Sequence, residues 1–200
     1  MAMDEALLET ARHPILRVYR WAAPAVSFGY FEKWMPVENA HRDREPVRRW
    51  TGGGVVLHGE DFTYSLLAPA GSAWAELEPM ESYRAIHEAL AAALQSSGAP
   101  VALAEENAAK KSAACFENPV RHDIVLNNRK VAGAAQRRTR FGCLHQGSVQ
   151  LPVAFPGLAQ RLADELSAAG KADDFPLAVR TRAVELVESR YGAKSWLEKF

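Results

Sequence analysis

The sequence predicts an α+β protein with a mixed, largely antiparallel sheet and helices packed against it. Short segments rich in β-branched and aromatic residues recur along the first three quarters of the chain. A single long amphipathic pattern over residues 79–97 predicts a helix in the middle, and the last fifty residues are helical in character. Because no internal repeat or linker divides the 200 residues, we expect one domain spanning 1–200.

In the first half of the chain, strand and helix signals alternate. An apolar stripe predicts a helix over residues 2–12, and Pro14 ends it. A short helix is expected from Pro36 to residue 43, and Pro79 and Gly98 suit the two ends of the long helix over 79–97. Strands are predicted at residues 15–21, 25–30, 47–50, 55–58 and 62–68.

The second half contains a clear hairpin signal. Two asparagines, Asn127 and Asn128, separate the strand-like runs 122–126 and 130–135, and such a pair is typical of a tight β-turn. Further strands are expected at 101–104 and 143–151, with a polar loop over 106–119. Helices are expected at 156–170 and 180–192.

The composition excludes several classes of protein. Lys plus Arg and Asp plus Glu both number 24, so a zero formal net charge argues against a general nucleic-acid or membrane-surface binder. No signal-peptide pattern or membrane-spanning stretch is visible, and two cysteines suit a reduced pair better than a disulfide. We therefore expect a cytoplasmic protein. There is no HExxH or CxxC pattern, so no metal site is predicted.

The segment RRWTGGGVVLH, residues 48–58, is the strongest local signal for a ligand site. Three successive glycines, Gly52 to Gly54, permit positive φ and leave bare N–H groups that can cradle a carboxylate or phosphate. Arg48 and Arg49 can contribute, although only one of two strand neighbours points to a given face. The alternative is a tight bend with solvated arginines. His58 has the same ambiguity, and without visible partners the residues favour a structural role.

A second stretch changes the interpretation of the glycine loop. RKVAGAAQRR (129–138) and the segment through HQGSVQL, together with RRWTGGGVVLH, DEALL (4–8), PAVSFGYF (24–31) and TYS (63–65), resemble the lipoate–protein ligase A and octanoyltransferase family. The blocks occur in the family's order and cover most of the chain. The resemblance implies the fold of a biotin/lipoate protein ligase-type catalytic domain, which is an α+β domain on a mixed sheet. The family attaches a lipoyl or octanoyl group to one lysine of a carrier domain.

The resemblance also assigns roles to individual residues. Lys130 matches the lysine that holds the acyl carbonyl, where a fixed ammonium stabilises an oxyanion by about 3 kcal/mol. Gly133 and Ala134 would keep the backbone close to the ligand. By the same resemblance, the acyl and nucleotide pocket is lined by Arg48, Arg49, Thr51, Gly52, Gly53, Gly54 and His58.

The family includes two chemistries, and the sequence leaves both open. One branch takes octanoate from acyl carrier protein and stores it as a thioester on a cysteine, which Cys115 in SAACFENP matches by position. The other branch uses ATP and Mg²⁺ to activate lipoate as an adenylate. The sequence has no counterpart of the ligases' C-terminal accessory domain, so either activation occurs elsewhere or a separate protein supplies that part. Octanoyl transfer without a tightly bound cofactor is therefore the favoured expectation.

The expected macromolecular partner is a lipoyl carrier domain, from glycine cleavage H protein or a 2-oxoacid dehydrogenase E2. Acyl carrier protein is the expected donor. A basic run at the hairpin's end, Arg137, Arg138 and Arg140, offers two interpretations: a solvated strand end, or a docking surface for acidic carriers. A non-catalytic carrier-binding module and a biotin ligase are weaker alternatives, because Lys130 and the glycine loop occur together and RKVAG resembles the lipoate branch.

Overall fold

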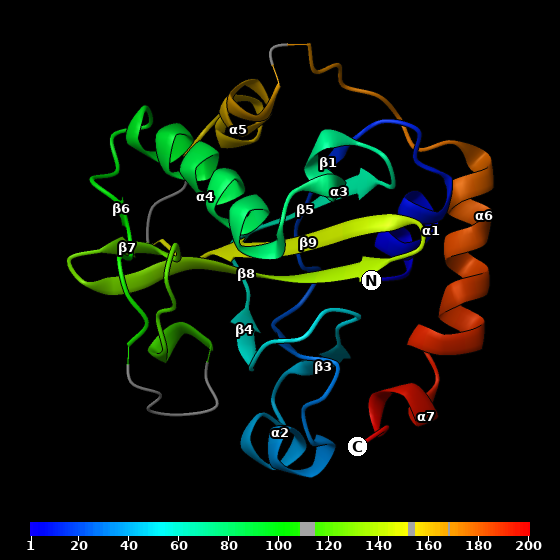
Figure 1. Ribbon diagram of the computed structural model, residues 1–200. Helices are drawn as coiled ribbons and strands as arrows, with labels where there is room; N and C mark the ends of the chain where they lie inside the picture. The colour runs from blue at the N-terminus through cyan, green and yellow to red at the C-terminus, as the bar shows by residue number, and fades with distance from the viewer. Residues whose placement is uncertain (109–114, 152–154, 168) are drawn as a thin grey trace.

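The computed structural model describes residues 1–108, 115–151, 155–167 and 169–200, and of Cys115 only the backbone. Two sheets and the helices around them form the fold (Figure 1). All five strand pairings of the larger sheet are antiparallel. In spatial order its strands are β1 (Ile15–Tyr19), β5 (Phe62–Pro69), β9 (Gly142–Val149), β8 (Arg129–Thr139), β7 (Ile124–Leu126) and β6 (Ala102–Leu103).

The smaller sheet is mixed. Its central strand β2 (Ala25–Phe28) pairs parallel with β3 (Glu45–Arg48) and antiparallel with β4 (Val56–His58). The predicted fold class, a mixed and largely antiparallel sheet with packed helices, is therefore confirmed.

The β7–β8 hairpin turns where the sequence predicts. Asn127 and Asn128 have φ values of 51° and 62°, the left-handed pair that a two-residue turn of type I′ requires. Strand β8 then forms a second and longer hairpin with β9, paired from Ala132 opposite Val149 to Thr139 opposite Gly142. This long hairpin carries the Lys130 strand through the middle of the molecule (Figure 1).

Helices cover the large sheet and supply the core. Helix α4 (Pro79–Gln95) begins at Pro79 as expected and packs with α5 (Leu158–Leu166) over the sheet, burying Ile86, Leu90 and Leu94. Helix α1 (Ala2–Thr10) packs against α6 (Leu177–Leu186) at the other end (Figure 1). The small sheet has its own cluster with helix α2 (Trp34–Ala40).

Some short elements differ from the sequence prediction. Helix α2 begins at Trp34 and ends at Ala40, so Pro36 lies inside its first turn. Helices α3 (Ala73–Glu76) and α7 (Lys194–Leu197) and the 3₁₀ turn η1 (Cys115–Glu117) lie in segments without a predicted helix. The end of the last predicted helix is a π-helical turn, η2 (Val187–Tyr191). These elements are too short for a hydrophobic period to reveal them.

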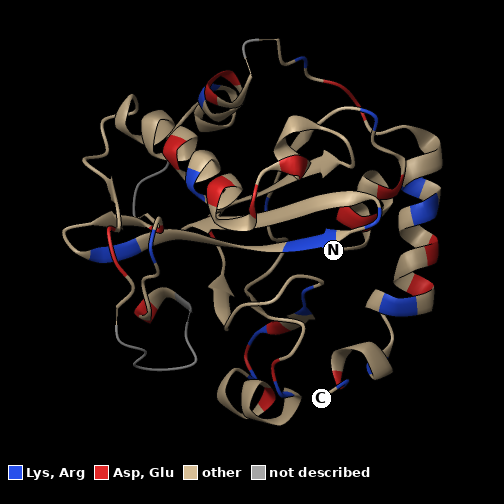
Figure 2. Cartoon of the chain, in the orientation of Figure 1, with Lys and Arg blue, Asp and Glu red and all other residues tan. Residues whose placement is uncertain are grey.

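Charged residues lie mainly on the outer helices and loops, while strand β8 carries basic segments at both ends (Figure 2). In the described ranges, every helix is too short or too polar to cross a membrane.

Candidate functional site

A cavity lies where the two sheets meet. The large sheet contributes residues of β5, β8 and β9, and the small sheet contributes Ser27 of β2 and His58 of β4. The apolar part of its wall includes Met1, Tyr19, Trp21, Val56, Phe116 and the small residues Gly133 to Ala135. Its other lining residues are Arg49, Gly53, Thr63, Gln146, Gly147 and Ser148. The cavity therefore combines apolar surface with a few polar groups, as small-molecule sites usually do.

The predicted glycine loop reaches this cavity at Gly53. Its φ of +88° is a left-handed conformation that L side chains rarely adopt, and an added Cβ would approach Nη2 of Arg49 to 3.2 Å. Arg49 holds the loop from inside, donating from Nη2 to the carbonyl oxygens of Gly52 (3.0 Å) and Gly54 (2.7 Å). Gly29 supports the loop from the β2 side, where a Cβ would lie 1.9 Å from the Gly53 carbonyl oxygen.

Thr51, at the start of the loop, is anchored to the N-terminal helix. Its hydroxyl donates to Oε1 of Gln146 at 2.8 Å, and Nε2 of Gln146 donates to Oδ2 of Asp4 at 2.7 Å. Arg17 completes this chain with a 2.8 Å bond to Asp4 Oδ1. Asp4 and Thr51 are fully buried, so the DEALL segment and the glycine loop are joined through one polar network.

Lys130 lies beside the cavity, next to Gly133. Its ammonium forms a buried ion pair with Asp123, with Nζ 2.7 Å from Oδ2. Gly133, which lines the cavity, makes room for that side chain, since a Cβ there would lie 2.6 Å from Nζ. Phe116 also lines the cavity, and Nζ lies 5.6 Å from its ring centroid. The structure therefore brings the strand of Lys130 and the glycine loop to one cavity, with Gly53 in contact range of Ala135.

Asp123 is held by helix α4 as well as by Lys130. Tyr83 donates its hydroxyl to Asp123 Oδ1 at 2.5 Å and accepts the backbone N–H of Ala134 at 3.1 Å. Burial and then the charge of Asp123 raise the pKa of Tyr83 well above its ordinary value, so the phenol remains a donor. The backbone N–H of Val120 donates to Oδ2 at 2.7 Å. Asp123 is therefore a fixed carboxylate that positions the Lys130 ammonium.

The two adjacent arginines have different environments. Arg49 lines the cavity, but Arg48 points away from it and is 1% exposed. Arg48 donates to the carbonyl oxygens of Tyr30 (2.7 Å), Glu32 (2.8 Å) and Leu197 (3.0 Å). The expectation that both arginines contact the ligand is corrected: Arg48 holds the 29–32 segment and α7 in place. The alternation of side chains along a strand explains the split.

The basic run at the end of β8 is hydrogen-bonded to neighbouring elements, while Arg138 and Arg140 remain exposed. Arg138 donates to the carbonyl oxygens of Ala75 (2.6 Å) and Leu77 (2.7 Å), and Arg137 donates to that of Trp50 at 3.0 Å. The guanidinium of Arg137 also stacks over the ring of Trp50. These bonds link neighbouring elements, and both interpretations of the run, a solvated strand end or a docking surface for acidic carriers, stay predictions.

The other predicted site residues have mixed outcomes. His58, Gly133 and Ala134 line the cavity, and Gly52 and Gly54 flank Gly53. The side chain of Cys115 lies outside the described part of the structure, although its chain neighbour Phe116 lines the cavity. Residues missing from the sequence prediction are Ser27, Gly29, Asp61, Asp123 and Gln146. The PAVSFGYF block contains Ser27 and Gly29, the HQGSVQL block contains Gln146, and Asp123 precedes the hairpin, but their partners are far away in sequence.

Comparison with solved structures identifies the fold. The domain resembles the Thermoplasma acidophilum protein Ta0514 with bound lipoic acid, with a TM-score of 0.80 and 20% identity, covering 100% of this chain and 92% of that one. It also resembles a lipoate-protein ligase A bound with ATP (TM-score 0.77, 20% identity, covering 98% and 92%). A bi-partite lipoate protein ligase with its E2 lipoyl domain from T. acidophilum gives 0.77 at 19% identity, covering 100% and 91%. The fold is that of lipoate ligase-type catalytic domains.

Sequence comparison then gives the family. A family model described as the lipoyl protein ligase A/B catalytic domain matches residues 1–188, so the chain belongs to this family. Among curated relatives, "Octanoyltransferase LipM" of Moorella thermoacetica is 38% identical over 163 residues, which is 76% of this chain and 60% of the relative. The same-named protein of Staphylococcus aureus is 33% identical over 165 residues, covering 74% and 60%. The chain thus spans about 60% of the length of these relatives.

Proposed function

We propose that this chain transfers an octanoyl group to a specific lysine of a lipoyl carrier domain, with Cys115 holding the group as a thioester between two steps. The family assignment and the relatives named octanoyltransferase support the acyl-transfer class. The observation that carries the proposal is one cavity formed by the glycine loop and the strand of Lys130. Its aromatic and small apolar residues suit an alkyl chain.

The chemistry proceeds through two balanced exchanges. Cys115 gives up its thiol proton and the thiolate attacks the thioester carbonyl of the octanoyl donor; a C–S bond to the enzyme forms, the donor's C–S bond breaks, and the donor thiolate leaves and takes up that proton. The carrier's lysine amine then attacks the enzyme thioester, giving an amide and regenerating the cysteine thiol. Each step passes through a tetrahedral oxyanion, which the Lys130 ammonium stabilises electrostatically. In this scheme Asp123 keeps that ammonium in place beside Gly133.

ATP-dependent lipoate ligation is the second candidate. Its support is the presence of Arg49 and the bare backbone of Gly53 in the cavity wall, which also suits a carboxylate or phosphate. In ATP-dependent ligation, ATP is a co-substrate that brings Mg²⁺ with it, and no cofactor stays bound to the enzyme.

The donor and carrier also belong to the proposal. We infer that acyl carrier protein delivers the octanoyl group in the cytoplasm. The accepting lysine lies on glycine cleavage H protein or on an E2 lipoyl domain. The structural neighbour described with its E2 lipoyl domain supports this class of acceptor.

The test incubates the chain with a lipoyl domain and one of two donors, followed by the intact mass of the lipoyl domain. Octanoyl-acyl carrier protein is expected to give the octanoylated domain without ATP, and Cys115→Ser is expected to abolish it. If ATP, Mg²⁺ and lipoate instead give lipoylation that Cys115→Ser retains, the ligase reading replaces the proposal. If neither donor modifies the domain, both readings fail.

A further inference from the structure

A buried hydrogen-bond chain runs from Asp61 to the glycine loop and is not part of the acyl-transfer chemistry above. Asp61 accepts from Nδ1 of His58 at 2.8 Å, and Nε2 of His58 lies 2.6 Å from Oγ of Ser27. Arg49 then donates from Nη1 to the same Ser27 oxygen at 2.8 Å. The same guanidinium holds the carbonyl oxygens of Gly52 and Gly54 through Nη2.

The direction of each hydrogen bond follows from Asp61. Its carboxylate also accepts from the backbone N–H of Gly59 (2.9 Å) and the hydroxyls of Thr63 (2.8 Å) and Ser148 (2.7 Å). Burial opposes ionisation, but the hydrogen bonds from His58, Gly59 and Ser148 lower the pKa of Asp61 well below its ordinary value. An ionised carboxylate only accepts, so all four neighbours must donate to it.

This requirement fixes the tautomer of His58. A proton on Nδ1 is shared with Asp61, so in the neutral ring Nε2 is an acceptor and the Ser27 hydroxyl must donate to it. Because the Ser27 hydroxyl proton is used on His58, the Ser27 oxygen can only accept from Arg49, and it accepts the N–H of Nη1. Each contact therefore determines the polarity of the next.

Trp21 covers the hydrogen-bond chain at His58. Its indole stacks on the His58 ring with centroids 4.2 Å apart and an interplanar angle of 22°, and its Nε1 donates to Thr63 Oγ1 at 2.9 Å. The side chains of His58 and Asp61 are each 4% exposed. In such a low-dielectric setting a hydrogen-bonded network is stronger and more rigid than in water.

We propose that Asp61, His58 and Ser27 are positioning residues that fix the place of Arg49 and, through it, the conformation of Gly52–Gly54. This inference rests on the proposed function only in taking that loop as part of the acyl site. The three residues act through Arg49, and the loop would lose its shape when any link is removed. None of them exchanges the acyl group.

A structural test needs no activity. For the neutral ring of His58, nitrogen-15 NMR of histidine-labelled protein is expected to show the proton on Nδ1, the signal being assigned by its loss in His58→Gln. Asp61→Asn is expected to change that signal and to shift the backbone amides of Gly52, Gly53 and Gly54. Arg44→Ala is the matched control, because among the described residues the Arg44 side chain hydrogen-bonds only backbone carbonyls, those of His58 and Ala25. It is expected to leave the glycine amides in place.

A kinetic test uses octanoyl transfer by the full chain. Ser27→Ala and Asp61→Asn are each expected to lower kcat/KM roughly 10- to 100-fold, as for loss of a hydrogen bond to a charged group. Because the links act as one unit, the double variant should lose little more than the worse single one. Ser27→Thr keeps the hydroxyl and should recover most of the activity.

Three results would overturn the proposal: a neutral His58 ring with its proton on Nε2 in the wild type, glycine amides that do not move in folded Asp61→Asn, or fully additive kinetic losses in the double variant. If octanoyl transfer itself is absent, the NMR result still decides between a positioning chain and an inert cluster.

Discussion

At the residue scale, the missing side chain of Gly133 leaves room for the Lys130 ammonium. A Cβ at position 133 would lie 2.3 Å from Cε of Lys130 and 2.6 Å from Nζ. The colliding atoms are the far end of a flexible side chain, so the lysine can move away, but its ammonium then leaves the buried ion pair with Asp123.

Gly133→Ala is therefore expected to lower the transfer rate at least roughly tenfold, because a donor to the oxyanion contributes about this much or more. The free energy of unfolding should also fall, because the displaced ammonium leaves Asp123 buried without its ion-pair partner. Steady-state kinetics and urea denaturation give the two quantities. Gly59→Ala is the matched control, with nothing within 4 Å of the added methyl. Equal activity in both variants would contradict the placement of Lys130.

The Lys130–Asp123 pair makes a second prediction at this scale. Lys130→Ala should abolish transfer and also leave Asp123 buried without its ammonium partner, with Tyr83 and Val120 still donating to it. Breaking one side of a buried pair costs about 3–5 kcal/mol, less where hydrogen bonds remain. Transfer assays and urea denaturation of the same sample measure both effects. Full activity in this variant would show that the oxyanion is stabilised by another group.

At the element scale, Arg48 and Arg49 show how one strand end serves both fold and site. Arg48 ties the 29–32 segment to α7, while Arg49 shapes the glycine loop. Trp196 of α7 adds a 3.2 Å bond from Nε1 to the Arg48 carbonyl oxygen. Arg48 of β3 thus holds helix α7 twice, through its side chain to the Leu197 carbonyl oxygen and through its own carbonyl oxygen to Trp196.

Arg48→Met is expected to destabilise the protein by about 2–4 kcal/mol, because several buried carbonyl groups lose a charged donor. The KM for the octanoyl donor should stay near that of the wild type, since the side chain faces away from the cavity. Thermal unfolding and initial-rate kinetics are the measurements, with Arg49→Met as the comparison that should lose kcat/KM instead. A large KM change in folded Arg48→Met would restore its predicted role at the ligand.

Elements with a strong local pattern were predictable from the sequence, and contacts across the chain were not. The β7–β8 turn follows from two asparagines, and α4 follows from its apolar stripe between Pro79 and Gly98. Helices α3 and α7 are four residues each, so no period marks them. The glycine loop and Lys130 were recognisable as motifs. Asp61 was not recognisable, because its role depends on a hydrogen-bond chain through His58 to Ser27 of β2, and Ser27 is distant in sequence.

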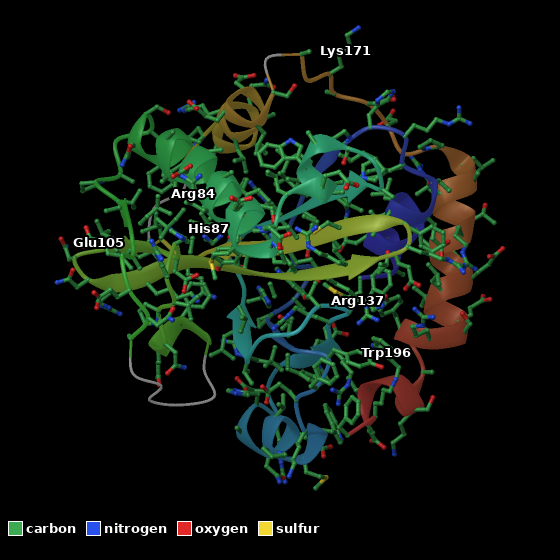
Figure 3. All side chains as sticks on the ribbon, viewed as in Figure 1. Arg84, His87, Glu105, Arg137, Lys171 and Trp196 are labelled. Atoms are coloured by element: carbon green, nitrogen blue, oxygen red, sulfur yellow. The ribbon has the colours of Figure 1, made fainter. Side chains whose placement is uncertain are left out.

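At the scale of the whole molecule, two buried histidines make stability depend on pH. His87 lies on α4 over the large sheet (Figure 3), with its ring centroid 5.5 Å from that of His145 on β9. Burial lowers the pKa of His87 to about 4, although Nδ1 bonds the His122 carbonyl oxygen at 2.6 Å. Burial, and then the nearness of His87, lower the pKa of His145 well below its usual value.

Both histidines are neutral in the folded chain, and in the unfolded chain they bind a proton below about pH 6.5. The unfolded state therefore holds more protons between about pH 6.5 and pH 4, and the free energy of unfolding should fall on acidification through this window, by about 3 kcal/mol for His87 alone. Urea denaturation across that range measures the slope. His87→Asn keeps a donor for the His122 carbonyl without titrating, and should reduce the slope. An unchanged slope in this variant would remove His87 as the cause.

The central claim is that an octanoyl group rests in the cavity between the glycine loop and the Lys130 strand on its way to an amine. Its most direct test is the intact mass of the wild-type chain after brief exposure to octanoyl-acyl carrier protein without a lipoyl domain. The account predicts one octanoyl adduct that maps to Cys115, is absent in Cys115→Ser and disappears when a lipoyl domain is added. A wild-type chain that never acquires the adduct, yet octanoylates the lipoyl domain, would contradict it.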